Sequence, residues 1–231
     1  ASGKYSSSSG GGGNVASGLV SYVSGGGNNR AVGRYTSVSG GANNEASGIH
    51  KDINGGGFSS ISGGYRNIAS GEFSSVTAGS DNSATDSYSS VSGGRFNEAS
   101  GYASSISGGH SNAANEEYSS VTGGSNNLAV GSYSSVSGGS RNEASGKYSS
   151  SSGGGGNVAS GLVSYVSGGG NNRAVGRYTS VSGGANNEAS GIHKDINGGG
   201  FSSISGGYRN IASGEFSSVT AGSDNSATDS Y

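Results

Sequence analysis

The stretch AVGSYSSVSGGSRNE, residues 129–143, shows the pattern that decides the fold. It fits the consensus A-S-G-x-Y-S-S-V-S-G-G-x-x-N-x, whose positions are numbered 1 to 15 from the Ala. Residues 144–231 repeat residues 1–88 without a change, so a super-repeat, 1–143, is followed by a partial copy, 144–231. We therefore expect one continuous repeat array over residues 1–231. Its units are 1–15, 16–30, 31–45, 46–68, 69–83, 84–98, 99–113, 114–128 and 129–143, and the irregular unit 46–68 recurs as 189–211.

The composition excludes several classes of protein. Of 231 residues, 50 are Gly and only 29% are hydrophobic, which is too little apolar material for an ordinary globular core. The chain has no Cys, which excludes disulfides and thiolate metal sites. A net charge of −2 gives no electrostatic footprint for nucleic acid or anionic membrane. No apolar run approaches the ~20 residues of a membrane-spanning helix, and we expect the chain to be a segment of a longer protein.

Several columns of the repeat hardly vary, and this regularity argues against a disordered linker. Position 11 is always Gly, position 6 is always Ser or Thr, and position 8 is Val or Ile in nearly every unit. The segment SSSSGGGGN, residues 6–14, has a linker-like composition, yet its Ser6, Gly11 and Asn14 stand in their proper columns. We interpret it as the weakest coil of a folded array.

The repeat predicts an all-β fold, a parallel β-solenoid built from 15-residue coils. The Y-S-S-V-S segment alternates and ends at Gly-Gly, which indicates a short strand and a turn, and N-x-A-S-G offers a second strand. Strand alternation points Val at position 8 inward, with Ser at 6 and Gly at 10 on the same side. Asn at 14 and Ala at 1 follow inward on the second strand, while positions 5, 7 and 9 point outward.

The Asn column at position 14 has two interpretations that the sequence leaves open. Buried side-chain amides can bond to the equivalent amides one coil away, ~4.8 Å along the stack. Alternatively, each Asn is a turn residue that tolerates the left-handed conformation. The column comprises Asn14, Asn29, Asn44, Asn67, Asn82, Asn97, Asn112, Asn127 and Asn142.

The aromatic column at position 5 predicts self-association. Alternation aims these side chains away from a thin interior, and soluble monomers rarely expose a long apolar stripe. Val20 and Ala103 interrupt the column. We expect burial of this assembly column between chains of a homotrimer or between columns of a filament. Its members are Tyr5, Tyr35, Phe58, Phe73, Tyr88, Tyr118 and Tyr133.

The consensus resembles the head repeat of YadA-type trimeric autotransporter adhesins, which has the general form S-V-A-I-G-x-x-A-x-A-x-G. In SSVSGGRFNEASG, Val91, Gly94, Ala99 and Gly101 match the Val, Gly, Ala and following Gly of that form. Asn-containing 15-residue versions also occur in bacterial and phage-fibre repeat proteins. The resemblance implies a left-handed parallel β-roll, three chains per head, and a surface adhesive or fibrous role.

The irregular unit 46–68, ASGIHKDINGGGFSSISGGYRNI, has one coil plus eight residues. Either ASGIHKDI is inserted ahead of a coil that starts at Asn54, or the unit contains a half-coil. His50, Lys51 and Asp52 gather charge there. They are interpreted either as a projecting loop that binds a ligand or neighbouring fibre, or as a register-adjusting bulge with solvated charges.

No catalytic constellation stands out, and we expect neither an enzyme nor a cofactor or metal site. The histidines are His50, His193 (the copy of His50) and His110, which stands in a variable turn position and should be exposed. Glu45, Glu98 and Glu143 recur at position 15, where a solvated edge is expected rather than acid–base chemistry. The Gly-Gly-x-x-Asn turns lack the Asp and the nine-residue period of Ca²⁺-binding β-rolls.

The sequence therefore predicts a non-catalytic structural segment of a long extracellular or cell-surface fibre or adhesin shaft. Its expected partner is itself, with a host surface or glycan as a further partner, and without nucleic acid or membrane insertion. The alternatives are a phage tail-fibre segment and a hydroxyl grid, formed by Ser at positions 7 and 9, that binds ice or polysaccharide.

Overall fold

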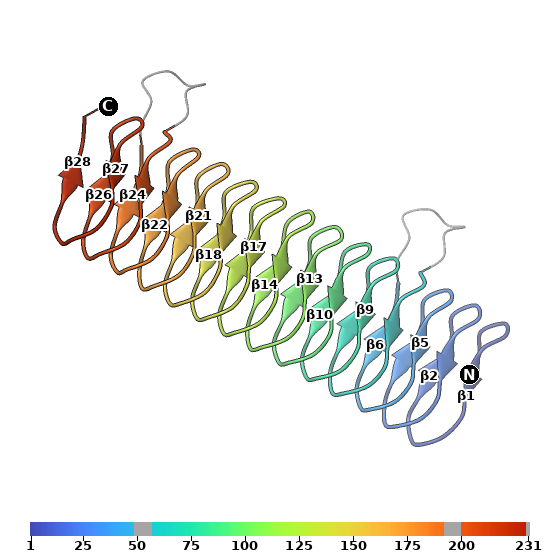
Figure 1. The fold of residues 1–231 in the computed structure, drawn as a ribbon. Coiled ribbons are helices and arrows are strands. Elements are labelled where there is room, and N and C mark those ends of the chain that lie inside the picture. Colours follow the sequence, from blue (N-terminus) through green and yellow to red (C-terminus); the bar gives the residue numbers. More distant parts are fainter. Residues whose placement is uncertain (49–56, 192–199, 230–231) are drawn as a thin grey trace. The chain divides into compact units, whose positions relative to one another are not determined.

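The computed structural model describes residues 1–48, 57–191 and 200–229, and these residues form an all-β parallel solenoid (Figure 1). No helix occurs in the described residues, so none of them has the form of a membrane-crossing helix. The chain divides into two compact units, Ala1–Tyr118 and Ser119–Tyr231, and each is a stack of 15-residue coils with one longer coil. The predicted solenoid is confirmed, whereas the single array over 1–231 stays a prediction.

The first ladder of each unit joins positions 7 and 8 of successive coils in parallel register, for example Ser75 with Ser90 and Val76 with Val91. In the first unit its strands are β1 (Ser7–Ser8), β3 (Tyr22–Val23), β5 (Ser37–Val38), β7 (Ser60–Ile61), β9 (Ser75–Val76), β11 (Ser90–Val91) and β13 (Ser105–Ile106). In the second unit they are β15 (Ser120–Val121), β17 (Ser135–Val136), β19 (Ser150–Ser151), β21 (Tyr165–Val166), β23 (Ser180–Val181), β25 (Ser203–Ile204) and β27 (Ser218–Val219).

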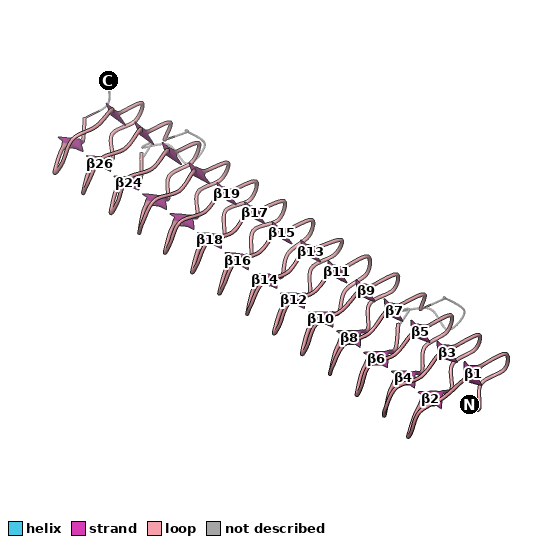
Figure 2. Ribbon diagram, turned by 60° about the horizontal axis from the view of Figure 1, so that its bottom comes forward, coloured by secondary structure: helices cyan, strands magenta, loops and turns pink. Residues whose placement is uncertain are grey.

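The second ladder joins position 15 of one repeat with position 1 of the next, and it forms a second row of strands in each unit (Figure 2). In the first unit its strands are β2 (Val15–Ala16), β4 (Arg30–Ala31), β6 (Glu45–Ala46), β8 (Ile68–Ala69), β10 (Ser83–Ala84), β12 (Glu98–Ala99) and β14 (Ala113–Ala114). In the second unit they are β16 (Leu128–Ala129), β18 (Glu143–Ala144), β20 (Val158–Ala159), β22 (Arg173–Ala174), β24 (Glu188–Ala189), β26 (Ile211–Ala212) and β28 (Ser226–Ala227).

A third line of contact, which sequence reasoning missed, consists of single parallel bridges at position 12. Arg95, for example, bridges to Ser80 in one neighbouring coil and to His110 in the other. The side chains at position 12 vary freely because only their backbone groups take part. Each coil thus has three β contacts with its neighbours, which satisfy most of its backbone donors and acceptors.

The core is thin and consists of one large and one small apolar column. Val or Ile at position 8 and Ala at position 1 are almost completely buried, as Val91 and Ala99 illustrate. Among the described residues, the buried polar side chains are Ser or Thr at position 6 and Asn at position 14, together with Ser151 at position 8. The predicted inward positions 1, 6, 8 and 14 are therefore confirmed.

The buried Asn side chains form a continuous hydrogen-bonded column within each unit. The Oδ1 of Asn82 accepts the backbone N–H of Asn97 at 3.0 Å, and in this coil also its Nδ2 at 3.1 Å. The Nδ2 of Asn97 also donates to the carbonyls of Gly93 and Gly109, each at 3.0 Å. The ladder prediction is confirmed with one refinement, since most of its bonds join an amide side chain to backbone.

The alternative role for Asn, a left-handed turn residue, is wrong for position 14. The left-handed non-glycine residues lie at positions 5 and 13, for example Tyr88 and Phe96, with φ of 60° and 55°. Two turns thus complete each coil. The turn at positions 3–5 is called the aromatic edge, and the turn at positions 10–13 is called the polar edge.

The prediction that Gly at position 10 points inward is also wrong. A Cβ built on Gly93 would meet no atom within 4 Å, so this position faces open space. The alternation ends with the short strand, because the chain turns immediately after position 9. The constant glycine is the next one. Gly94 has a φ of +86°, and a Cβ there would collide with the carbonyl of Gly109 in the adjacent coil and with Asn97 Nδ2.

The linker-like segment SSSSGGGGN folds as a coil in both of its copies. Ser7–Ser8 is β1, and the second copy, Ser150–Ser151, is β19. Ser151 takes the Val column between Val136 and Val166, where it is fully buried and its Oγ has no hydrogen-bond partner. This buried hydroxyl without a partner is a physical reason why the coil should be less stable than its neighbours.

Replacing Ser151 with Val should stabilise the protein by about 1–3 kcal/mol, because it removes an unsatisfied buried hydroxyl and restores apolar contact. Urea denaturation followed by circular dichroism measures the change. Ser150→Val, on the outer side of the same strand, is the matched control and should change the stability by less than ~0.5 kcal/mol. Equal effects of the two substitutions would show that the Val column is not a buried core.

The irregular unit keeps its place in the ladders. Strand β5 pairs with β7 and β6 pairs with β8, so the described residues 46–48 and 57–68 complete one coil and the half-coil alternative is wrong. Ala46 is part of β6, so the insertion does not precede a coil that starts at Asn54. Gly48 and Gly57 occupy positions 3 and 4 and lie against each other, and the eight extra residues, 49–56, fall between them.

Deleting residues 49–56 should leave the solenoid intact, because Gly48 and Gly57 already lie close enough to be joined in a regular turn. We expect an unchanged β spectrum and a melting temperature within a few degrees of the parent chain. Deleting residues 61–68, a segment of the same length that includes β-strand residues, is the control and should disrupt the ladders. Unfolding by the first deletion would make the extra residues part of the structural framework.

Candidate functional site

The aromatic column lies along the aromatic edge, and its side chains are exposed as predicted. Each position-5 residue ends a tight turn, and in the first unit, from the second coil onward, its backbone N–H donates to the position-4 carbonyl of the preceding coil, as in Val20 N to Lys4 O. Tyr88 N donates to Glu72 O and Tyr118 N to Tyr102 O, both at 2.8 Å. These bonds hold position 5 in the left-handed conformation. The exposed fraction of the aromatic side chains in the first unit lies between 39% and 69%.

The residue types at position 5 are unfavourable for this backbone. A left-handed conformation costs an ordinary L-residue roughly 1–2 kcal/mol, and Gly, Asn and Asp tolerate it best. The other left-handed position, 13, follows this preference in part: Gly13, Asn43, Asp81 and Asn126 are among its members, and so are Arg66, Phe96, Ser111 and Arg141. Position 5 has only Tyr, Phe, Val and Ala. The local backbone therefore does not explain the aromatic column.

Neighbouring rings of the column stack on one another. The ring centroids of Tyr35 and Phe58 are 4.7 Å apart with planes at 6°, and those of Phe58 and Phe73 are 4.8 Å apart with planes at 2°. The second unit repeats this with Tyr178, Phe201 and Phe216. Such pairs contribute ~0.5–1.5 kcal/mol each, which offsets part of the backbone strain. The stacked rings cover each other's faces, so this part of the column presents ring edges outward.

The gap at Ala103 is filled from the adjacent position. Tyr102, at position 4, makes edge-to-face contacts with Tyr88 and Tyr118, each with centroids 5.6 Å apart. The aromatic stripe of the first unit is therefore continuous from Tyr35 to Tyr118. Sequence reasoning treated Ala103 as an interruption, although the preceding tyrosine was the signal that could have corrected it.

Basic residues accompany the aromatic column in part of each unit. Lys4 Nζ lies 5.2 Å from the ring centroid of Tyr5, and Arg34 Cζ lies 5.3 Å from that of Tyr35. Lys147 and Arg177 repeat this arrangement in the second unit. Cation–π contacts at exposed sites contribute ~0.5–1 kcal/mol.

The hydroxyl grid exists as two columns on the outer side of the first ladder. Ser75, Ser90 and Ser105 stand in register at position 7, where they are half-buried. Position 9 beside them is exposed and contains Ser or Thr. Tyr22 and Tyr165 interrupt the position-7 column, so the longest regular stretches of the grid lie between these coils.

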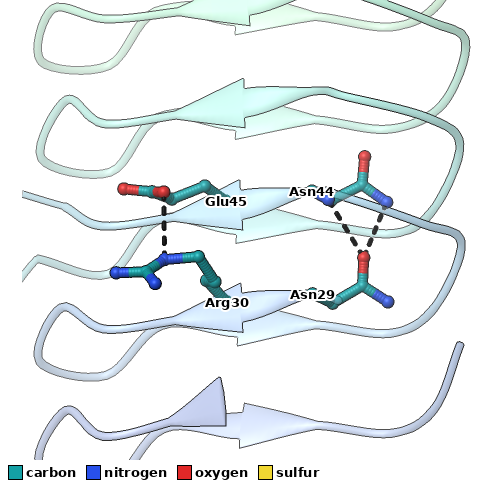
Figure 3. A network of polar contacts seen from close by, with 4 residues as sticks. All are labelled: Asn29, Arg30, Asn44 and Glu45. Atoms are coloured by element: carbon teal, nitrogen blue, oxygen red, sulfur yellow. Dashed lines mark hydrogen bonds and ion pairs between the residues drawn. The ribbon is translucent and has the colours of Figure 1, made fainter. Parts of the chain in front are cut away.

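The outer side of the second ladder has charges that pair within the chain. Arg30 Nε lies 3.2 Å from Glu45 Oε2 in the next coil, and Figure 3 shows this ion pair beside the Asn29–Asn44 rung. Arg173 and Glu188 repeat it at 3.4 Å. Exposed ion pairs contribute little stability, with a typical range of ~0–1 kcal/mol. Glu45, Glu98 and Glu143 all stand on this outer side, as the alternation predicted.

The remaining candidates from the sequence give no further constellation. His110 is exposed and its ring contacts Phe96 edge-on, with centroids 5.8 Å apart. His50, Lys51, Asp52 and His193 lie outside the described residues. Within the described ranges, no three His, Asp or Glu side chains come together in a group that could hold a metal ion.

A comparison with protein-family models finds no match for this chain, and a comparison with curated protein sequences finds none either.

Proposed function

We propose that the chain is a non-catalytic structural segment of a long extracellular or cell-surface fibre or adhesin shaft, which associates with itself through the aromatic edge. The observation that carries the proposal is the aromatic column in left-handed backbone. A residue type that the local structure disfavours, repeated coil after coil, points to a function of the side chain itself.

The exposed surface of the aromatic column is better suited to bind a protein than to bind a flat carbohydrate. Sugars stack on the faces of aromatic rings, but Tyr35, Phe58, Phe73 and Tyr88 cover most of one another's faces. Ring edges and tyrosine hydroxyls suit a protein interface, in which one end of the side chain packs and the other forms hydrogen bonds. We include in this proposal that the chain associates into a homotrimer or a filament. We also include that its repeats are related to the head repeats of YadA-type adhesins.

The proposal is tested by replacing four stacked aromatics, Tyr35, Phe58, Phe73 and Tyr88, with Asn. Asn suits the left-handed turn, so the β spectrum should persist while self-association, followed by sedimentation velocity, weakens at least tenfold. Phe96→Asn is the matched control, because Phe96 has the same backbone conformation and is 46% exposed, but lies on the polar edge. Association that survives the fourfold variant would contradict the proposal.

A hydroxyl-grid binding surface is the second candidate, favoured by the in-register serines of β9, β11 and β13. A regular row of hydroxyls at ~4.8 Å spacing suits an extended, periodic ligand such as ice or a polysaccharide. Co-sedimentation with insoluble polysaccharide and an ice-affinity assay test this candidate. Ser90→Val should weaken such binding, whereas the fourfold aromatic variant should leave it unchanged.

A further inference from the structure

Three tyrosines gather at the end of the aromatic edge in the first unit, and they are called the tyrosine cluster. Tyr102 makes edge-to-face contacts with Tyr88 and with Tyr118, each with ring centroids 5.6 Å apart. All three side chains are exposed. Earlier along the same edge the stacked pairs include phenylalanine, as where Tyr35 stacks on Phe58. The cluster is thus a place where one phenol lies directly beside another.

The composition of the chain directs oxidation to its tyrosines. The sequence has 13 Tyr and no Cys, Met or Trp. Thiols and thioethers are the side chains that peroxides usually oxidise first. In a chain without these groups and without indole rings, the phenol of Tyr is the side chain that gives up an electron most readily. Neighbouring phenols are therefore the most reactive arrangement that this chain offers to an oxidant.

We propose that the tyrosine cluster is a site of oxidative cross-linking, at which Tyr102 couples to Tyr88 or to Tyr118 as dityrosine. The oxidant is hydrogen peroxide acting through a haem peroxidase. Each of the two phenols loses one electron and its hydroxyl proton, which gives two tyrosyl radicals. The radicals join through a ring carbon ortho to each oxygen, and the hydrogens on those carbons move as protons to the oxygens, which restores both phenols. The two electrons and two protons that were released reduce one hydrogen peroxide to two water molecules.

The backbone holds the coupling partners side by side. The N–H of Tyr118 donates to the carbonyl of Tyr102 at 2.8 Å, and the N–H of Ala103 donates to the carbonyl of Ser87, beside Tyr88, at 2.9 Å. Only the exposed side chains then have to rotate to bring two ortho carbons together, and such rotations take ps–ns. Groups held next to each other react at an effective concentration far above that of separate molecules. Coupling within the cluster should therefore exceed coupling of isolated tyrosines.

A dityrosine at this place joins neighbouring coils of a thin solenoid covalently, which a chain without Cys cannot do through a disulfide. The second unit has a similar pair, Tyr133 and Tyr148, with ring centroids 5.1 Å apart and planes at 27°. The inference goes beyond the proposed function and does not depend on it, because both partners of each bond belong to one chain.

Peroxidase treatment of the full 231-residue chain tests the inference. Hydrogen peroxide and the peroxidase are added, and chains that run as monomers on a denaturing gel are digested with trypsin. Trypsin cleaves after Arg66, Arg95 and Arg141, so Tyr88 and Tyr102 fall on separate peptides, 67–95 and 96–141. We expect these peptides joined, at their summed mass less two hydrogens, together with dityrosine fluorescence. The urea midpoint of the oxidised chain should rise by roughly 1 M, because a cross-link lowers the entropy of the unfolded chain.

Tyr102→Phe is the decisive variant, because it removes the central phenol and keeps the ring. Before oxidation its circular dichroism and urea midpoint should match those of the parent chain, whereas the yield of joined peptides should fall about tenfold or more. Tyr65→Phe is the matched control. Tyr65 is 43% exposed, against 41% for Tyr102, but lies on the polar edge against the guanidinium of Arg66. Its replacement should leave the yield unchanged.

The contrary outcomes are distinct from one another. An equal yield of joined peptides from the Tyr102→Phe chain would show that the cluster does not direct the coupling. Dityrosine confined to covalent dimers would show that coupling occurs between copies and not between neighbouring coils. Tyrosines that stay unreacted, or that are oxidised singly, under conditions that couple free N-acetyltyrosine would refute the inference as well.

Discussion

Gly94→Ala is expected to destabilise the solenoid by about 3 kcal/mol or more. Gly94 adopts a φ of +86°, which an L-residue rarely adopts, and its new methyl group would overlap the backbone of Gly109 in the next coil. The same methyl group would lie 2.5 Å from Asn97 Nδ2, so the Asn column would be displaced as well. Urea denaturation followed by circular dichroism measures the loss.

Gly93→Ala, one residue earlier, is the matched control. Its methyl group would enter open space, and we expect a change below ~0.5 kcal/mol, or a small gain from the less flexible unfolded chain. The inward orientation that strand alternation predicted for position 10 would instead make Gly93→Ala costly. A larger loss for Gly93→Ala than for Gly94→Ala would therefore contradict the turn geometry.

Asn97→Ala is expected to cost about 3–5 kcal/mol, the largest effect of any side-chain truncation in its coil. The buried N–H of Asn112 loses its acceptor and the carbonyl of Gly93 loses its side-chain donor, whereas the carbonyl of Gly109 keeps the backbone N–H of Arg95. Each buried polar group left unsatisfied costs ~1–3 kcal/mol. The measurement is the midpoint of thermal and urea unfolding.

Two further variants separate hydrogen bonding from size. Asn97→Asp keeps the shape and one acceptor but removes the donor and buries a charge, so it should be at least as destabilising as Asn97→Ala. Asn115→Ala changes an exposed Asn at position 2 and should have little effect. If the Asn97→Ala and Asn115→Ala variants have the same unfolding midpoints, the Asn column does not hold the coils in register.

The sequence pattern correctly predicted the inward-facing positions that lie in or beside a strand. Val at position 8 and Ser at position 6 flank one outward residue, so the two-residue period identified them correctly. The period failed at Gly93 and its equivalents because the strand ends at position 8 and the chain turns after position 9, and residue patterns do not mark the end of a two-residue strand. The bridge at position 12 was missed because only its backbone takes part.

The sequence predicted which residues form the exposed aromatic column, but it did not predict their backbone conformation. The tyrosines and phenylalanines of position 5 were expected outside, and they are, yet alternation placed them on a strand. They lie in a left-handed turn, as Tyr88 shows with its φ of 60°. Nothing in the residue types signals this, because Tyr and Phe are poor left-handed residues. That mismatch is the reason to assign the column a function, and it becomes visible only when backbone and side chain are seen together.

Light scattering of the purified 231-residue chain, recorded with its far-UV circular dichroism spectrum, tests self-association most directly. A chain of 22.2 kDa that pairs through its aromatic edge should scatter as a dimer or a larger assembly, should show a β spectrum, and should dissociate on dilution. A stable 22.2 kDa monomer with the same β spectrum would leave the solenoid intact and would contradict the proposal that this edge joins one copy to another.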